Sequence, residues 1–192
     1  MPHIQTRTLA EHRDWRRAQL IDAAAAIALE SGGSAITVAA VAQRAGLART
    51  SVYEYFGSSA DLIADLIIDE LKNFAISLTE AVGDCQNPVE RIELWIAGAL
   101  RYIADGRHLL AKALNSTSTP QDRAAAIGAS HRALLAPLHT ALENIGVSDI
   151  AQALSYIQAT TDVAAKRIEA GNDAESEIKS ATQFCIKGLA SQ

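Results

Sequence analysis

One short stretch of the sequence concentrates side chains that donate and accept hydrogen bonds. In Arg49-Thr50-Ser51-Val52-Tyr53-Glu54-Tyr55-Phe56, the apolar Val52 and Phe56 lie four positions apart, which is the spacing of one face of a helix. The other face then presents arginine, threonine, serine and tyrosine. Such side chains form hydrogen bonds with base edges and phosphates. The stretch therefore predicts a short helix with a face suited to nucleic acid.

The sequence offers no arrangement of side chains suited to catalysis or metal binding. His131 and His139 lie eight positions apart, with no acidic residue at a spacing that would complete a metal site. The glycines fall at predicted helix ends and form no phosphate-binding loop. Cys85 and Cys185 lie 100 positions apart without a CxxC pair, which predicts neither zinc nor a disulfide framework. We expect no catalytic residue, no metal and no cofactor.

The residues before the polar stretch predict two helices that lead to it. Apolar residues recur at three- and four-residue spacing over about 14–31, and two glycines end that helix. Thr37 is placed as the N-cap of a helix of about two turns. Gly46 ends this second helix, because glycine adopts positive φ at little cost.

A long helix is predicted after the polar stretch. Ser58 and Asp61 form a start similar to a capping box, and the apolar pattern continues to about Ala81. Two short helices joined by a glycine turn, with a longer helix on each side, predict a helix-turn-helix over 37–56.

Many spaced positions between residues 36 and 62 form a recognisable pattern. They are Ile36-Thr37-Val38, Val41-Ala42, Ala45-Gly46-Leu47, Ser51-Val52-Tyr53, Tyr55-Phe56, Ser58 and Asp61-Leu62. This pattern closely resembles the DNA-binding signature of the TetR family of transcriptional regulators, and the resemblance covers roughly 14–74. It implies an all-α fold with a helix-turn-helix domain over 14–74 and a helical ligand-binding and dimerisation domain over 75–192.

The resemblance also implies a function. Regulators of this family are usually repressors that a small-molecule ligand releases from a pseudo-palindromic DNA operator; an activator or a ligand-independent regulator of the same fold is the alternative. Ala48 and Ser59 depart from the pattern, because the family commonly has a helix-start serine and a lysine there. The residues expected at DNA are Thr37, Arg44, Ala48, Arg49, Thr50, Ser51, Tyr53, Tyr55 and Ser59.

Charge is distributed unevenly along the chain. The formal net charge is −5, yet residues 1–58 carry six arginines and five acidic residues, a net charge of +1. Arg13, Arg16 and Arg17 crowd the entrance of the first helix, where they form either a solvated surface or phosphate contacts. The composition, 49% apolar and 20% charged, is typical of a folded helical protein. No apolar stretch approaches the roughly 20 residues that span a bilayer, so we expect a cytoplasmic protein with no membrane partner.

Beyond residue 74 the apolar pattern predicts further helices. Pro88 begins one of them, and a polar loop over 115–119 leads to another that runs from Pro120 to about Asn144. Large side chains with polar tips on these helices suit a pocket for an apolar or aromatic effector. The candidates are Trp95, Tyr102, His108, His131 and Tyr156.

The last two helices are predicted over about 148–170 and 173–190. They either close the core of one chain or form a four-helix bundle with a second copy. We favour a homodimer, because a helix-turn-helix needs a second copy to read a two-fold operator. The expected interface residues are Ile157, Ala164, Ile168, Ile178 and Ile186. The competing hypotheses are a small helical enzyme and a scaffold that dimerises without DNA, and neither needs the polar face of residues 49–55.

Overall fold

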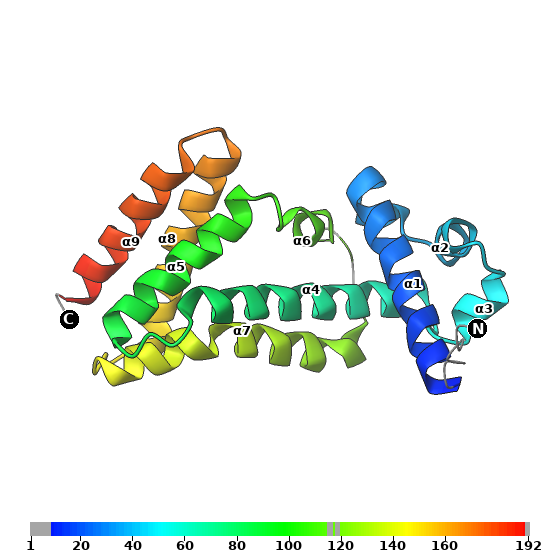
Figure 1. The fold of residues 1–192 in the computed structure, drawn as a ribbon, viewed down its shortest axis with the longest axis horizontal. Helices are drawn as coiled ribbons and strands as arrows, with labels where there is room; N and C mark the ends of the chain where they lie inside the picture. The colour runs from blue at the N-terminus through cyan, green and yellow to red at the C-terminus, as the bar shows by residue number, and fades with distance from the viewer. Residues whose placement is uncertain (1–8, 115–116, 118–119, 191–192) are drawn as a thin grey trace, which may run out of the picture. The chain divides into compact units, whose positions relative to one another are not determined.

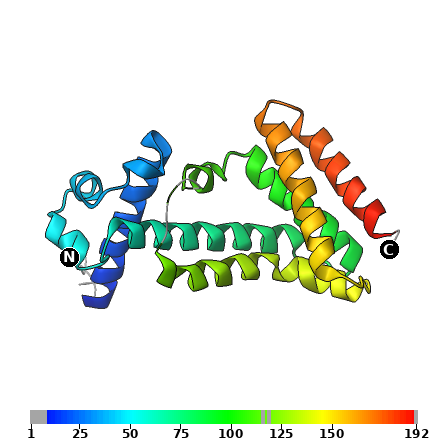
Figure 2. The same cartoon turned by 180° about the vertical axis from the view of Figure 1, so that it is seen from behind.

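Every element of regular structure in the described residues is a helix, which confirms the predicted all-α class. The structure is a computed structural model that describes residues 9–114, 117 and 120–190. Figures 1 and 2 show its helices from opposite sides. They are α1 (Leu9–Ser31), η1 (Gly33–Ala35), α2 (Val38–Ala45), α3 (Arg49–Tyr53), α4 (Ser59–Val82), α5 (Pro88–Ala104), α6 (Leu109–Leu114), η2 (Gln121–Arg123), α7 (Ala124–Asn144), α8 (Ile150–Glu169) and α9 (Ala174–Leu189).

The described residues divide into two compact units. The N-terminal unit falls within Met1–Asp69 and Leu110–Ile127, and the C-terminal unit falls within Glu70–Leu109 and Gly128–Gln192. Each unit has its own apolar core. The N-terminal unit is therefore discontinuous in sequence, because it includes α6, η2 and the first residues of α7.

The core of the N-terminal unit is built from one apolar side of each helix. Leu20 and Ala24 of α1 are fully buried, one turn apart, as the three- and four-residue spacing predicts. Val41 of α2 and Val52 of α3 are also fully buried against them, and Phe56 closes the cluster. Packing of these buried side chains thus holds the helices in place, and the opposite faces of the helices point away from the core.

The turn between α2 and α3 has the geometry predicted from its residues. The Thr37 hydroxyl accepts a hydrogen bond of 3.1 Å from the Ala40 N–H, so Thr37 is the N-cap of α2. Gly46 adopts the left-handed conformation with φ of 68°, and the following Leu47 N–H donates to the Ala42 carbonyl. The chain reverses here in a few residues and enters α3 at Arg49.

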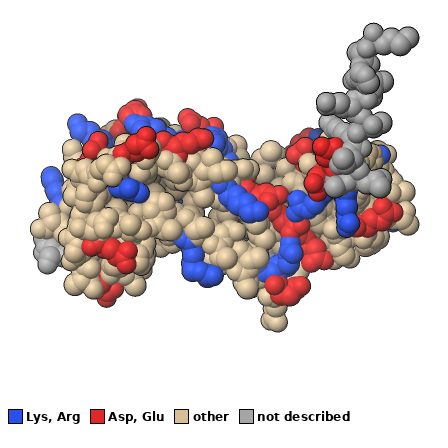
Figure 3. Space-filling view, turned by 60° about the horizontal axis from the view of Figure 1, so that its bottom comes forward, with Lys and Arg blue, Asp and Glu red and all other residues tan. Residues whose placement is uncertain are grey.

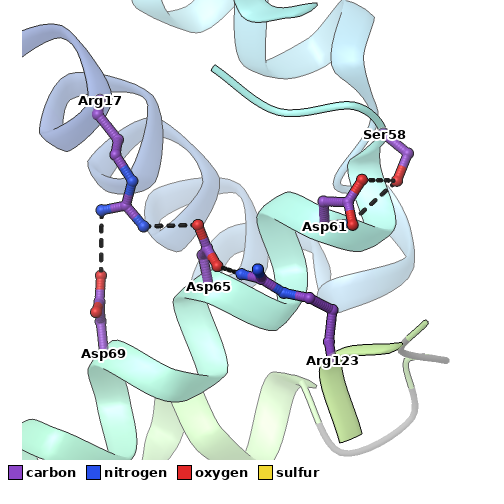
Figure 4. Close-up of polar contacts among 6 residues, drawn as sticks. All are labelled: Arg17, Ser58, Asp61, Asp65, Asp69 and Arg123. Carbon is purple, nitrogen blue, oxygen red and sulfur yellow. Dashed lines mark hydrogen bonds and ion pairs between the residues drawn. The ribbon is translucent and has the colours of Figure 1, made fainter. Parts of the chain in front are cut away.

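A reciprocal pair of hydrogen bonds begins α4. The Ser58 hydroxyl accepts a bond of 3.1 Å from the Asp61 N–H and donates one of 2.8 Å to the Asp61 carboxylate. The predicted start of this helix is confirmed, and Figure 4 shows the pair.

The C-terminal unit packs α5 on α8 and α9, which also pack on each other. Its fully buried side chains include Ile92, Ile96 and Leu100 of α5, spaced so that they form one stripe. Asn87, Asp149 and Asp173 cap α5, α8 and α9 through their side chains. These helices are therefore specified by both their caps and their apolar faces.

Several predicted boundaries differ from the observed ones. Helix α1 begins at Leu9 rather than near residue 14, and α3 ends at Tyr53 rather than Phe56. The amides of Tyr55 and Phe56 both donate to the Val52 carbonyl, so these residues form a turn after the helix. Pro120 is the N-cap of η2, and α7 follows and continues through Pro137. Of the predicted loop over 115–119, all but Thr117 lies outside the described residues.

Within the part of the chain that the structure describes, no helix combines the length and the apolar character that crossing a membrane requires.

Replacing the cap of α2 should weaken the N-terminal unit, while adding the missing cap to α3 should strengthen it. We expect Thr37→Ala to lower the free energy of local unfolding of residues 38–56 by about 1 kcal/mol, because the Ala40 N–H loses its acceptor. Ala48, the N-cap of α3, has extended backbone but no acceptor, so Ala48→Ser should raise the same quantity. Amide hydrogen exchange measures both changes. An unchanged free energy of local unfolding in Thr37→Ala, or a lower one in Ala48→Ser, would contradict these roles of the two caps.

Candidate nucleic-acid interface

Helix α3 presents a polar face because its apolar side is buried. Val52 is fully buried in the core of the N-terminal unit, whereas Arg49, Thr50 and Tyr53 are exposed. Tyr53 keeps 57% of its surface exposed, a large value for an aromatic side chain. An exposed guanidinium, hydroxyl and phenol on one short helix are groups that bind base edges and phosphates.

The other predicted contact residues surround α3. Ser51 and Tyr55 are half-buried beside Val52. Thr37 and Ala48 are exposed at the starts of α2 and α3, and the half-buried Ser59 is the first residue of α4. All of these residues belong to the N-terminal unit, and their contact with DNA stays a prediction.

Arg44 has a partner that the sequence analysis missed. Its guanidinium forms two hydrogen bonds, of 2.6 Å and 2.5 Å, with the Glu30 carboxylate of α1. These hydrogen bonds and the opposite charge lower the pKa of Glu30 and raise that of Arg44. Arg44 thus ties α2 to α1, and the acidic residue near the end of the first predicted helix was the available signal.

The three arginines at the start of α1 have different surroundings. Arg17 donates to Asp65 at 2.6 Å, lies 3.9 Å from Asp69 and stacks over the Phe56 ring at 5.7 Å. Arg16 lies over the Trp15 ring at 5.3 Å, and Arg13 is exposed. Figure 4 shows Arg17 directed at the carboxylates of α4. Arg17 therefore binds carboxylates of the protein itself, whereas Arg16 is half-buried and Arg13 is exposed to solvent.

The charge of the surface is mixed rather than uniformly positive. On the face shown in Figure 3, basic and acidic side chains are interleaved. Residues 1–58 have a net charge of only +1, and Arg17 and Arg44 are paired with carboxylates. Attraction to a phosphate backbone would therefore depend on individually placed groups such as Arg49 and Arg13.

The same segment matches a known family. Residues 20–66 match the family described as bacterial regulatory proteins, tetR family. The chain is thus similar to this family over these residues. The match begins at the buried Leu20 of α1 and ends at the buried Leu66 of α4, so it includes both α2 and α3.

Two curated relatives match the chain over less than half of its length. The HTH-type transcriptional regulator BetI of Brucella anthropi is 35% identical over 82 residues, which are 43% of this chain and 42% of the relative. The HTH-type transcriptional repressor KstR of Rhodococcus jostii is 31% identical over 86 residues, 45% of this chain and 40% of the relative. The match thus spans about two-fifths of the length of these relatives.

Solved structures of the TetR type share the whole fold. A TetR-like transcriptional regulator from Rhodococcus sp. RHA1 superimposes with a TM-score of 0.71 at 21% identity, covering 97% of this chain and 100% of that one. FadR from Bacillus subtilis, solved in complex with stearoyl-CoA, superimposes with a TM-score of 0.73 at 21% identity, covering 89% and 98%. The chain therefore has the fold of those regulators beyond the segment that matches in sequence.

Three of the five predicted pocket residues have partners inside the C-terminal unit. The indole N–H of the buried Trp95 donates to the Leu134 carbonyl at 3.4 Å. The Tyr102 hydroxyl donates to Glu70 at 2.8 Å, and burial and this carboxylate raise the pKa of Tyr102 to about 12. His108 Nε2 lies 2.6 Å from the Glu169 carboxylate.

The remaining two pocket candidates do not join this group. His131 is exposed on α7, and Tyr156 is 60% exposed on α8. Tyr156 lines an apolar groove between α8 and α9, and a role of either residue in effector binding stays a prediction. Arg107, which was not among the predicted residues, stacks over the Tyr102 ring at 4.5 Å and donates to Ser77.

The residues predicted at a dimer interface lie in or against the core of the C-terminal unit instead. Ile157, Ala164 and Ile178 are buried there, and Ile168 and Ile186 pack against it from partly buried positions. The regular isoleucine stripes of α8 and α9 are thus the sides that face the chain's own core. The large apolar side chains left exposed on these two helices are Tyr156, Val163 and Phe184.

Proposed function

We propose that the chain is a sequence-specific DNA-binding regulator of transcription whose recognition helix is α3. The observation that carries this proposal is the exposed Arg49, Thr50 and Tyr53 face of a short helix that Val52 fixes in the core. The curated names of BetI and KstR, an HTH-type regulator and an HTH-type repressor, support it, because the matched segment includes this helix. Such a protein acts where the chromosome is, so we propose a cytoplasmic location.

In this proposal residues 14–74 bind DNA and residues 75–192 bind an effector and a second copy. Helix α3 enters the major groove, where Arg49 donates to a guanine and Thr50 and Ser51 contact neighbouring base edges or phosphates. We assign contacts with the phosphate backbone to four further residues of the N-terminal unit: Thr37, Tyr53, Tyr55 and Ser59.

Arg49→Ala should reduce specificity as well as affinity. We expect specific binding to weaken by about 1–3 kcal/mol, because a bidentate contact to guanine is lost, while binding to random duplex changes less. The measurement is titration of the full chain with a duplex selected from a random pool and with a scrambled duplex.

Arg101→Ala is the matched control, because Arg101 is exposed and pairs with Glu175 at 3.7 Å within the C-terminal unit. Equal losses of affinity for selected and scrambled duplexes with Arg49→Ala would show that Arg49 does not read a base.

We also propose that the chain is a homodimer formed through the outer faces of α8 and α9. An apolar groove of about 420 Å³ lies between these helices, and Tyr156, Phe184 and Leu189 are among its lining residues. Phe184 is 72% exposed beside it, which is costly for so large an apolar side chain in a monomer. A second copy would cover this surface and supply the second α3 that a two-fold operator requires.

Phe184→Glu should separate the dimer without unfolding the chain, since Phe184 lies outside the core. We expect a folded monomer at micromolar concentration and a loss of operator affinity of at least about a hundredfold, because each half-site is then bound alone. Sedimentation and duplex titration measure the two effects. Ile76→Glu is the control, because Ile76 is 57% exposed on α4. A parent chain that sediments as a monomer would refute the dimer.

We further propose that an apolar or amphipathic small molecule releases the chain from DNA. The complex of the structural neighbour FadR with stearoyl-CoA supports this proposal, as do the aromatic side chains of Trp95 and Tyr102 on α5. A ligand that prefers the arrangement unable to hold DNA shifts the population toward it.

Stearoyl-CoA is the first compound to test. We expect it to lower the affinity for the selected duplex by about tenfold, a typical coupling between two ligands. Stearate without coenzyme A separates an effect of the acyl chain from one of the whole ester. An unchanged affinity would remove acyl-CoA esters from the candidate effectors.

A further inference from the structure

Residues 110–127 are part of the N-terminal unit although the chain reaches them from α5. Leu114 of α6 is buried in the core of the N-terminal unit, and Leu110 and Ala113 pack against that core. The Ala113 carbonyl lies 2.7 Å from the position that a Cβ atom on Gly33 would occupy. The backbone of α6 therefore lies directly on η1, and glycine at position 33 permits that contact.

The Asp65 carboxylate links the segment 110–127 to α1 and α4 of the same unit. Asp65 of α4 forms an ion pair with Arg123 at the end of η2 and another, of 2.6 Å, with Arg17 of α1. Figure 4 shows the two arginines approaching opposite oxygens of the same carboxylate. The Asp65 side chain is only 15% exposed. Removing one arginine leaves the carboxylate with the other, whereas removing Asp65 leaves two cations without this partner.

The pair Asp65–Arg123 lies next to the points where the chain crosses between the units. Helix α4 continues from the N-terminal unit into the C-terminal unit after Asp69, and α7 does so after Ile127. Asp65 and Arg123 lie about one helical turn before these crossings. A helix transmits a displacement along its length. A charge pair between Asp65, in the N-terminal part of α4, and Arg123, directly before α7, therefore constrains both helices.

We propose that Asp65 is a positioning residue that couples DNA binding to the state of the C-terminal unit, by holding Arg17 of α1 and Arg123 before α7 on one carboxylate. The proposal rests on the DNA-binding function proposed above. Coupling between two sites is reciprocal, so DNA bound by the N-terminal unit must change the C-terminal unit. This reciprocity permits a test that needs DNA but no effector.

Arg123→Ala should remove the coupling and spare the DNA-binding surface. Asp65 keeps Arg17, so the pairing of α1 with α4 remains and the exposed face of α3 is untouched. We expect the affinity for the selected duplex to change by less than about threefold. The duplex should slow amide exchange in residues 128–144 by about fivefold or more in the parent, and this slowing should be lost in the variant.

The experiment measures amide hydrogen exchange of the full-length chain with and without the selected duplex. Arg101→Ala is the control, since Arg101 forms an exposed ion pair within the C-terminal unit. Arg123→Lys keeps a cation within reach of Asp65 and should restore the effect of DNA on residues 128–144. A role in folding alone would change exchange in the free protein but would not remove the response to DNA.

Each outcome decides the proposal. Loss of the DNA response in Arg123→Ala at nearly unchanged duplex affinity, with rescue by Arg123→Lys, supports it. A normal DNA response in Arg123→Ala, no response in the parent, loss of duplex binding by Arg123→Ala, or a lysine variant that restores nothing overturns it. If the parent binds no duplex, the DNA-binding function has failed, and the coupling proposal that rests on it fails with it. Duplex binding by the parent without a response in residues 128–144 refutes the coupling alone.

Discussion

Helix α3 cannot exist without the core on which it lies. It has five residues, far fewer than an isolated helix needs in water. Burial of Val52 and Phe56 supplies the stability that hydrogen bonds within so short a helix do not. The capped α2, the left-handed Gly46 and the serine cap of α4 then fix the direction from which the chain enters and leaves. The proposed function depends on this constraint, because only a rigidly seated helix presents Arg49 and its neighbours in one orientation.

Ion pairs in the N-terminal unit join its helices to one another. Arg17 and Arg44 are bound by carboxylates of α4 and α1, so two of the six arginines among residues 1–58 hold helices together. Because the net charge of residues 1–58 is only +1, this region has no strong positive field that would attract DNA. Binding that relies on a few placed cations has a weaker salt dependence than binding by a basic patch, since fewer counterions are released. Specificity would then depend on the fit of α3 in the major groove.

Local signals in the sequence predicted the N-terminal helices well, because caps and turns need only nearby residues. Thr37, Gly46 and the Ser58–Asp61 pair each have the predicted role. Long-range partners were not predictable in this way. The pairing of Arg44 with Glu30 joins different helices, and the ion pair of Arg123 with Asp65 joins segments far apart in the chain. Periodicity also identified α8 and α9 as apolar but did not distinguish the core side, with Ile157, from the outer side, with Phe184.

We propose that two copies of α3 read one duplex, and selection from a random pool of duplexes by the full chain tests this directly. Sequencing of the bound fraction reports what the protein recognises, with no operator chosen beforehand. We expect enrichment of an inverted repeat whose half-site centres lie about 34 Å apart, one turn of the double helix, or a multiple of that distance. A pool without enrichment after repeated rounds, or one enriched in a single half-site without its inverted copy, would contradict it.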